Sequence, residues 1–250
     1  MKTMKATCKA LITAVILVCG MAAYSHAQTA DEILRKMDEI TYAPKDQVST
    51  TTITLIDKNG NQSMRKAEMK QKGKNMRFTR FTSPASQAGI AFLSLPNDVM
   101  YIYLPAFGRE RRIASHVKNQ SFAGTDFTYE DMEAIPYSEK FNPTLKETTD
   151  EYFVMELVPK PGVRSDYSRL VMQVDRNLFL PVHIDHYNRG NQMVKEMDVE
   201  YEQIQGYQAQ KRIVMKDLEK EHTTIMEVEE IRFDNNLDDS EFSVRKLRQQ

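Results

Sequence analysis

The sequence has almost no cysteine. Its two cysteines, Cys8 and Cys19, lie close to the N-terminus, and residues 20–250 contain none. Thiol catalysis, thiolate metal sites and disulfide bonds are therefore excluded from nearly all of the chain. This part of the protein must be stabilised by its hydrophobic core alone.

Motifs of hydrolytic and phosphate-binding enzymes are also absent. The sequence contains no Gly-x-Ser-x-Gly nucleophile turn and no glycine-rich phosphate loop. His183 and His186 are three residues apart on an expected strand, so they face opposite sides and cannot bind one metal together. His183 shares a face with Asp185, which we interpret as a polar surface pair. We expect no catalytic residue, no metal and no cofactor, and therefore a protein that is not an enzyme.

No apolar run reaches the roughly 20 residues that a membrane-spanning helix needs. The shorter apolar run at 10–23 follows Lys2, Lys5 and Lys9 and precedes the small-residue sequence Ser25-His26-Ala27. This arrangement is typical of a secretory signal peptide. We predict that residues 1–27 are a signal peptide, that cleavage follows Ala27, and that the protein is periplasmic.

Residues 28–250 are expected to form a single domain, because about 220 residues fit one large β domain. Removal of the three leader lysines leaves 31 basic and 35 acidic residues, a net charge of −4. An acidic surface disfavours nucleic acid as a partner.

Helical segments are expected at both ends of this domain. A capping box at 29–32 precedes apolar residues at helical spacing and predicts an amphipathic helix over 30–41. Such a short helix is unstable alone in water, so its apolar stripe must dock on another element. At the other end, 238–247 is predicted to form a last helical turn with Phe242 and Leu247 turned inward.

Most of the remaining chain has the pattern of β-strands. The segments are rich in β-branched residues or alternate in polarity, and turn sequences such as Asn59-Gly60 separate several of them. This many strands predicts an α+β, mainly β fold, built on a large and strongly curved antiparallel sheet. Which face of the sheet is concave stays open. The predicted strands are 48–57, 62–72, 75–82, 89–95, 99–105, 151–158, 167–175, 180–187, 192–202, 207–218 and 223–233.

Residues 114–143 interrupt the strand pattern. Capping spacing at 128–131 predicts a short helix over 129–135. On this interpretation Asp126, Glu130 and Asp131 surround a helix N-terminus, where acidic groups are favourable. A metal or acid–base cluster is the alternative.

One local basic cluster contains Arg109, Arg111, Arg112 and Lys118. It is either a solvated hairpin end or a contact for a lipid head group or an acidic partner, because the guanidinium fork suits phosphate and carboxylate. Both interpretations remain open.

Methionine is unusually frequent on the predicted strands. Strand cores usually favour stiff β-branched residues, whereas flexible methionine suits surfaces that adapt to ligands of variable shape. Either the core is simply rich in methionine or the sheet carries an adaptable apolar cavity. The hypothesised lipid-binding residues of this cavity are Ile53, Leu55, Phe78, Phe92, Tyr101, Tyr103, Met155, Met172, Met197 and Met215.

The most specific stretch begins with Tyr103-Leu104-Pro105-Ala106 and continues through Arg111-Arg112-Ile113. It ends in Ser121-Phe122-x-Gly124-Thr125-Asp126-Phe127-Thr128-Tyr129-Glu130-Asp131. The stretch resembles the signature of a longer branch of the LolA-like family, the outer membrane lipoprotein-sorting proteins. Its candidate signature and lid residues are Arg111, Arg112, Ser121, Phe122, Gly124, Asp126, Phe127, Tyr129, Glu130 and Asp131.

The resemblance implies a half-barrel whose concave face is covered by the N-terminal helix and the short mid-chain helix. It implies a monomeric periplasmic carrier that shields the acyl chains of lipoproteins, or another lipid, on the way to the outer membrane. The expected partners are those acyl chains, an inner-membrane transporter as donor and an outer-membrane acceptor. The alternative is an envelope sensor or protein-interaction module that uses the same fold without lipid transport.

Overall fold

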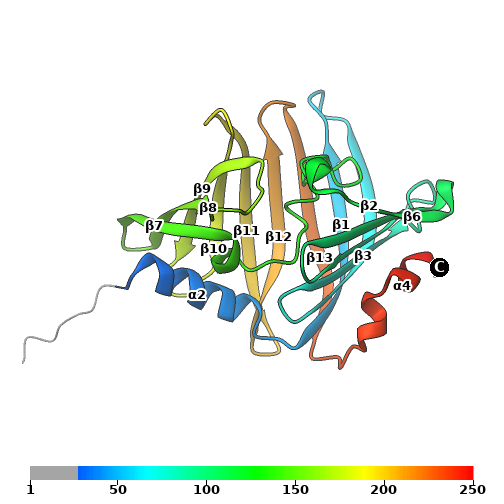
Figure 1. The fold of residues 1–250 in the computed structure, drawn as a ribbon, viewed down its shortest axis with the longest axis horizontal. Helices are drawn as coiled ribbons and strands as arrows, with labels where there is room; N and C mark the ends of the chain where they lie inside the picture. Colours follow the sequence, from blue (N-terminus) through cyan, green and yellow to red (C-terminus); the bar gives the residue numbers. More distant parts are fainter. Residues whose placement is uncertain (1–27, 250) are drawn as a thin grey trace, which may run out of the picture.

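The computed structural model describes residues 28–249 (Figure 1). The expected signal peptide and both cysteines lie outside the described residues, so the leader and its cleavage site stay predictions. No helix within 28–249 is long and apolar enough to cross a membrane.

Helix α2 (Ala30–Thr41) begins at the predicted capping box. The Thr29 hydroxyl accepts a hydrogen bond from the backbone N–H of Glu32 (3.3 Å), and the Glu32 carboxylate accepts one from the N–H of Thr29 (2.8 Å). The buried side chains Ile33, Leu34 and Met37 form the docking stripe. They pack into a core cluster on the sheet, which confirms the prediction for this helix.

All strands of the described chain belong to one antiparallel sheet of 13 strands. Their order across the sheet is β6-β5-β4-β3-β2-β1-β13-β12-β11-β10-β9-β8-β7. The expected mainly β class with a large curved antiparallel sheet is therefore confirmed. The strands are β1 (Asp46–Ile56), β2 (Gln62–Lys72), β3 (Met76–Ser83), β4 (Ala91–Leu95), β5 (Val99–Leu104), β6 (Arg109–Arg112), β7 (Phe141–Thr148), β8 (Tyr152–Pro159), β9 (Tyr167–Asp175), β10 (Pro181–Asn188), β11 (Met193–Ile204), β12 (Tyr207–Asp217) and β13 (His222–Phe233).

Short helical segments complete the fold. They are η1 (Pro105–Phe107), η2 (Ser115–Val117), α3 (Tyr137–Lys140), η3 (Asp239–Phe242) and α4 (Val244–Arg248).

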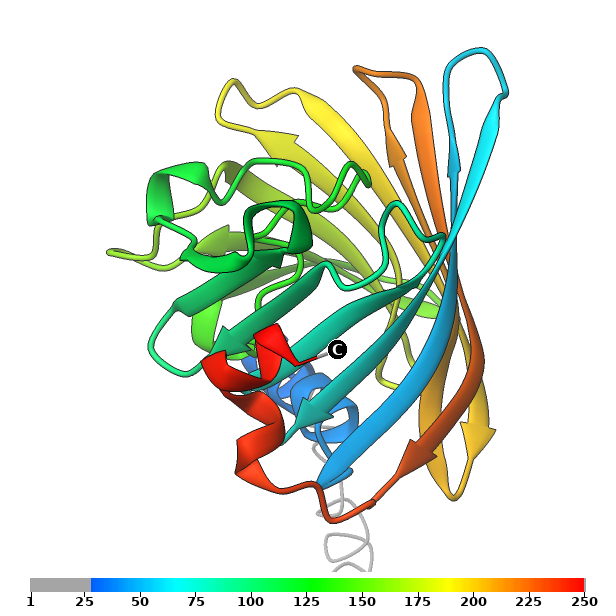
Figure 2. The ribbon, with the colours of Figure 1, turned by 90° about the vertical axis from the view of Figure 1, so that its right-hand side faces the viewer.

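The strand order explains why one face of the sheet is covered. The first and last strands, β1 and β13, pair at its middle, where Ile53 lies opposite Met226. From β1 the chain runs outward to the edge strand β6 and must then reach the opposite edge, β7. Residues 113–140, which we call the crossing segment, make this connection inside the curve of the sheet (Figure 2).

Two core clusters lie between the sheet and its covering elements. One packs α2 against strands such as β8 and β9, including Met155 and Met172. The other packs the crossing segment, through Phe122 and Phe127, against strands that include β1 and β4. The covered side is thus the concave face.

The C-terminal segment packs on the opposite, convex face, as Figure 2 shows for η3 and α4. Phe242 and Leu247 are buried against Phe78 and Leu93 of β3 and β4. The predicted inward placement of Phe242 and Leu247 is confirmed. The sheet is therefore covered on parts of both faces.

The sequence pattern missed two strands, β6 and β7, and these are the two edges of the sheet. β6 is Arg-Glu-Arg-Arg, and β7 contains Pro143. Charged side chains and proline are frequent on edge strands, because one side of the strand has no neighbour to hydrogen-bond. Neither strand therefore shows the apolar alternation of an interior strand.

The prediction of a helix over 129–135 is wrong in position, since these residues form turns and the short helix α3 follows them. The capping interaction does form: Thr128 Oγ1 accepts from the N–H of Asp131 (3.2 Å). The helix does not continue, because the N–H of Ala134 bonds to Ser94 Oγ (3.1 Å) and Ile135 precedes a proline.

Candidate functional site

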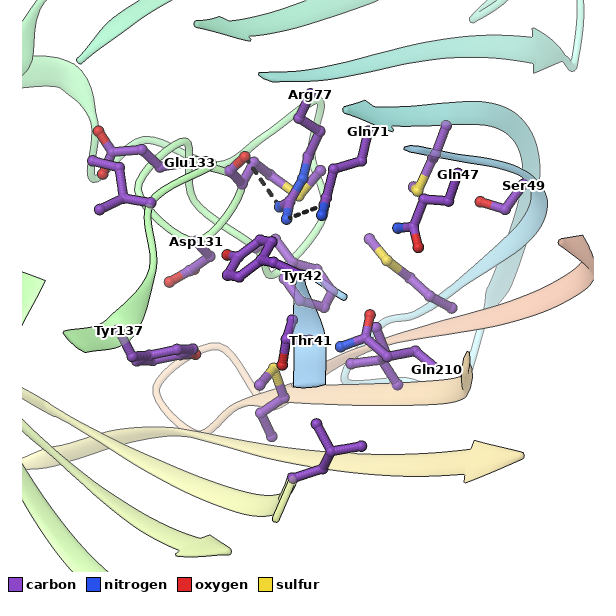
Figure 3. A pocket seen from close by; sticks show the side chains of 18 of the residues that line it. Thr41, Tyr42, Gln47, Ser49, Gln71, Arg77, Asp131, Glu133, Tyr137 and Gln210 are labelled. Carbon is purple, nitrogen blue, oxygen red and sulfur yellow. Dashed lines mark hydrogen bonds between the residues drawn. The ribbon is translucent and has the colours of Figure 1, made fainter. Parts of the chain in front are cut away.

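A cavity of about 260 Å³ lies between the concave face and its covering elements (Figure 3). Its sheet wall comes from the central strands β1, β2, β3 and β9–β13. Its cover comes from the end of α2, the crossing segment and the start of β7. Both halves of the chain therefore build the cavity.

Much of the wall is apolar and flexible. Three methionines line it from three strands, namely Met69 on β2, Met197 on β11 and Met226 on β13. The crossing segment adds Phe127 and Met132 from the other side. Methionine fills irregular space and adapts its rotamers to a guest, so this wall suits an apolar ligand without one rigid shape. The other apolar lining residues are Ile135, Phe141, Leu170, Leu180, Ala209, Ile213, Val228 and Ile231.

Another part of the wall is polar. Gln47, Ser49 and Gln71 project toward the same space as Arg77 in Figure 3. The Arg77 guanidinium donates to the side-chain oxygen of Gln71 (3.1 Å) and to the backbone carbonyl of Met132 (3.3 Å). The cavity is therefore amphipathic, since a cation and amides line it together with thioethers and aliphatic groups.

The end of α2 is fastened over the cavity by a buried carboxylate. Asp38 accepts hydrogen bonds from the backbone N–H groups of Tyr137 (3.1 Å) and Ser138 (2.8 Å), at the start of α3. Burial raises the pKa of Asp38, although these hydrogen bonds oppose the shift. Burial also raises the pKa of Tyr42, against the nearby positive charge of Arg77. Thr41, Tyr42 and Tyr137 thus close the cavity from the helix side (Figure 3).

The crossing segment is tied to the sheet by buried polar groups. Lys195 on β11 donates to the Asp126 carbonyl (2.7 Å), to Tyr167 Oη (3.2 Å) and to the Asp131 carboxylate (3.3 Å). Burial would raise the pKa of Asp131, but the charge of Lys195 and further interactions hold it below its ordinary value. Asp126 also contacts His222 Nδ1 on β13 (3.0 Å). Asp126 and Asp131 therefore fasten the crossing segment, and the interpretation of a helix N-terminus is wrong.

The remaining acidic groups of this segment are also paired with lysines. Glu130 and Glu133 contact Lys140, at 2.9 and 3.4 Å, and Glu133 contacts Lys118 at 2.5 Å. Lys118 is only 5% exposed and also pairs with Asp98. It therefore does not belong to the basic cluster expected from sequence, whose members Arg109, Arg111 and Arg112 lie on the exposed edge strand β6.

Glu130 and Tyr167 lie between this cavity and a second, more polar hollow of about 410 Å³. The second hollow is lined by groups such as Asp166, Arg189 and Lys220. The buried ion pairs thus separate an amphipathic cavity from a polar one.

Part of the predicted signature forms an aromatic cluster instead of lining the cavity. Phe122 is fully buried, and its ring centroid lies 5.7 Å from that of Phe81, 5.3 Å from that of Phe92 and 6.0 Å from that of Tyr129. Gly124 has a positive φ of 79°, which suits glycine at the adjacent turn. Ser121 pairs with Thr128 in an isolated bridge. These residues hold the crossing segment against the sheet.

Of the ten hypothesised lipid-binding residues, one, Met197, lines the cavity. Phe78, Tyr101 and Tyr103 pack with the C-terminal segment on the convex face, so they point away from it. The other six are buried in the two clusters of the concave face: Ile53, Leu55, Phe92, Met155, Met172 and Met215. Three signature residues do line the cavity, namely Phe127, Glu130 and Asp131.

The polar wall was not predicted from the sequence. Gln47, Ser49 and Thr51 alternate along β1 on the face that also carries Ile53. Such a polar run on the same face as core residues was the signal in the sequence that could have indicated the polar wall. It is weak, because polar alternation more often marks a solvated face.

The histidines behave as expected from their spacing. His183 contacts Asp185 (3.0 Å) and Asp198 of the neighbouring strand (2.7 Å), whereas His186 on the other face is buried. Within residues 28–249, no group of three or more metal-ligating side chains could hold an ion.

A family model described as "-like: Uncharacterized protein" matches residues 73–249, more than half of the chain. A search of curated proteins gave no match.

Solved structures share the fold over nearly their whole length. A DUF1329 family protein from Desulfovibrio piger is 24% identical, with a TM-score of 0.82, and the match covers 87% of this chain and 97% of that one. A domain named for outer membrane lipoprotein sorting, from Vibrio parahaemolyticus, is 25% identical, with a TM-score of 0.75, covering 86% and 100%. A LolA superfamily protein from Nitrosomonas europaea is 21% identical, with a TM-score of 0.73, covering 87% and 98%.

Proposed function

Because this chain belongs to the LolA-like family, we propose that it is a periplasmic carrier that shields acyl chains in its cavity. The cargo is a lipoprotein or another lipid on the way to the outer membrane, and no catalytic step is involved. The observation that carries the proposal is the cavity beneath the crossing segment, with three adaptable methionines on its sheet wall.

The physical need for such a carrier is strong. Each methylene exposed to water costs about 0.8 kcal/mol, so an acyl chain of 16 carbons does not pass freely through an aqueous compartment. A cavity that replaces membrane contact removes this cost. We propose that an inner-membrane transporter is the donor, that an outer-membrane protein is the acceptor, and that the carrier works as a monomer formed by residues 28–250.

Native mass spectrometry of the protein, purified from a periplasm without detergent, tests the proposal. We expect a bound acyl-chain species that lipid extraction can identify and that a triacylated lipopeptide displaces. A protein that carries no lipid and takes up neither lipid nor lipopeptide would contradict the carrier function and favour a protein-interaction module.

A matched pair of variants locates the binding site. Met197→Asp places a charge on the cavity wall, whereas Met64→Asp makes the same change at a side chain that is 61% exposed. We expect Met197→Asp to lower lipid binding at least tenfold, because an apolar chain then has to lie against a carboxylate. Met64→Asp should bind like the wild type. Equal binding by both variants, with both folded by circular dichroism, would place the lipid elsewhere.

A further inference from the structure

The charges around the cavity are not balanced. The three carboxylates that line it, Glu130, Asp131 and Glu133, are each paired with a lysine. Lys140 forms ion pairs with the two glutamates, and Lys195 forms one with the aspartate. The acidic side of the lining is therefore already neutralised within the protein.

Arg77 is the exception. It lies on β3, faces the cavity (Figure 3) and is half-buried. Its hydrogen-bond acceptors are an amide oxygen of Gln71 and a backbone carbonyl of Met132, both neutral. In the part of the chain that the structure describes, no carboxylate forms an ion pair with Arg77. A guanidinium partly removed from water and without a counter-charge favours an anion beside it.

The surroundings of Arg77 suit a hydrated or hydrogen-bonded anion. Gln47, Ser49 and Gln71 carry N–H or O–H donors on the same sheet wall, and Tyr42 adds a hydroxyl from the end of α2. The same lining also contains apolar side chains, such as Met197 on β11 and Ile213 on β12, that can contact a hydrocarbon chain. The cavity therefore offers hydrogen-bond donors for a charged head and apolar side chains for a hydrocarbon chain.

We infer that the cavity binds a single-chain amphiphile with an anionic head group, a carboxylate or a phosphate, which pairs with Arg77. This inference rests on the proposed carrier function and names its cargo class. A volume of about 260 Å³ lies just below the roughly 300–1,000 Å³ of small-molecule sites. This volume suits one acyl chain.

Binding of three probes with the same chain tests the inference: hexadecanoate, hexadecyl phosphate and the neutral methyl hexadecanoate. We expect the wild type to bind an anionic probe about tenfold to a hundredfold more tightly than the ester, the range of a charge-assisted hydrogen bond. Arg77→Gln should remove this preference and leave ester binding nearly unchanged. The anionic probe that binds more tightly identifies the preferred head group as a carboxylate or a phosphate.

Two further variants serve as controls. Arg77→Lys keeps the charge and should keep part of the preference, which separates the charge from any effect on folding. Arg232→Gln removes a positive charge at an exposed position on β13. This variant should keep the full preference for the anionic probes.

The unfavourable outcomes are distinct. If Arg77→Gln weakens all three probes equally, Arg77 only fastens the crossing segment through Met132, and the inference is wrong. If the wild type binds ester and anion equally, the inference is wrong but the carrier function stands. If it binds no probe and no lipopeptide, both are wrong.

Discussion

Two histidines three residues apart on β10 have opposite electrostatic surroundings. Partial burial opposes protonation of His183, yet hydrogen bonds and charge from Asp198 and Asp185 raise its pKa. His186 packs edge-on against Tyr167, with ring centroids 4.9 Å apart, and burial lowers its pKa despite the nearby charge of Asp131. One residue thus takes up a proton more readily in the folded state and the other less readily.

The two histidines should contribute to stability with opposite signs. Below its ordinary pKa of about 6.5, His186 protonates in the unfolded chain but not in the folded one, so acid destabilises the fold through it. The contribution of His183 is full below that pH and is lost as pH rises through its raised pKa. We expect His186→Phe to reduce the loss of stability between pH 7 and pH 5, and His183→Gln to increase it. Urea unfolding at both pH values measures this, and parallel pH profiles for the two variants would contradict it.

At the scale of elements, the edges and the C-terminal segment are the informative parts. β6 and β7 end the sheet with charge and proline, which protect an open edge against pairing with another chain. The segment η3–α4 covers the convex face of β3–β5 (Figure 2), and it contacts one residue of the cavity lining, where Glu241 pairs with Lys70 (2.7 Å). The apolar packing of Phe242 and Leu247 lies on the face away from the cavity, so we expect it to affect stability rather than ligand binding.

Leu247→Ala tests whether the C-terminal segment affects stability without affecting ligand binding. Leu247 is fully buried, so we expect the free energy of unfolding to fall by about 2–5 kcal/mol, the usual cost of a buried leucine truncated to alanine. Lipid binding at a temperature where the variant is folded should not change. Leu218→Ala is the matched control, because Leu218 is 41% exposed and its loss should cost little. A variant that keeps its stability but loses lipid would show that the C-terminal segment acts on the cavity.

At the scale of the whole molecule, the chain order determines how the cavity is closed. Because β6 and β7 lie at opposite edges, residues 113–140 must pass over the concave face to connect them. Buried contacts then hold this segment in place, chiefly Lys195 with Asp131 and Asp126. Residues 113–140 thus cover the cavity and connect the two edges of the sheet.

Lys195→Met should loosen this cover. Removing the lysine leaves a buried carboxylate unpaired, which costs about 3–5 kcal/mol. We expect amide hydrogen exchange in residues 120–133 to accelerate more than exchange in the central strands. Lys216→Met on the neighbouring strand breaks only two surface pairs, with Glu196 and Asp198, and should cost less than about 1 kcal/mol. Unchanged exchange in the crossing segment of Lys195→Met would show that the ion pairs do not fasten it.

By itself the sequence determined the elements whose signals are local. The capping box and apolar spacing identified α2, and β-branched or alternating runs identified the interior strands, because backbone preference and packing agree there. Only tertiary structure decided which face each strand residue occupies. Tyr101 and Tyr103 looked suited to the cavity, but a strand with apolar groups on both sides does not reveal which side is concave.

Tertiary contacts also determined the conformation of the crossing segment and the position of the polar wall. The cap at Thr128 formed, yet only turns follow it at 129–132, because the N–H of Ala134 bonds to Ser94 and Ile135 precedes a proline. Arg77 and Gln71 carry no local sign of a site, since polar strand residues usually face water. They meet in a cavity only because the sheet curves and the chain must cross its concave face to reach the opposite edge.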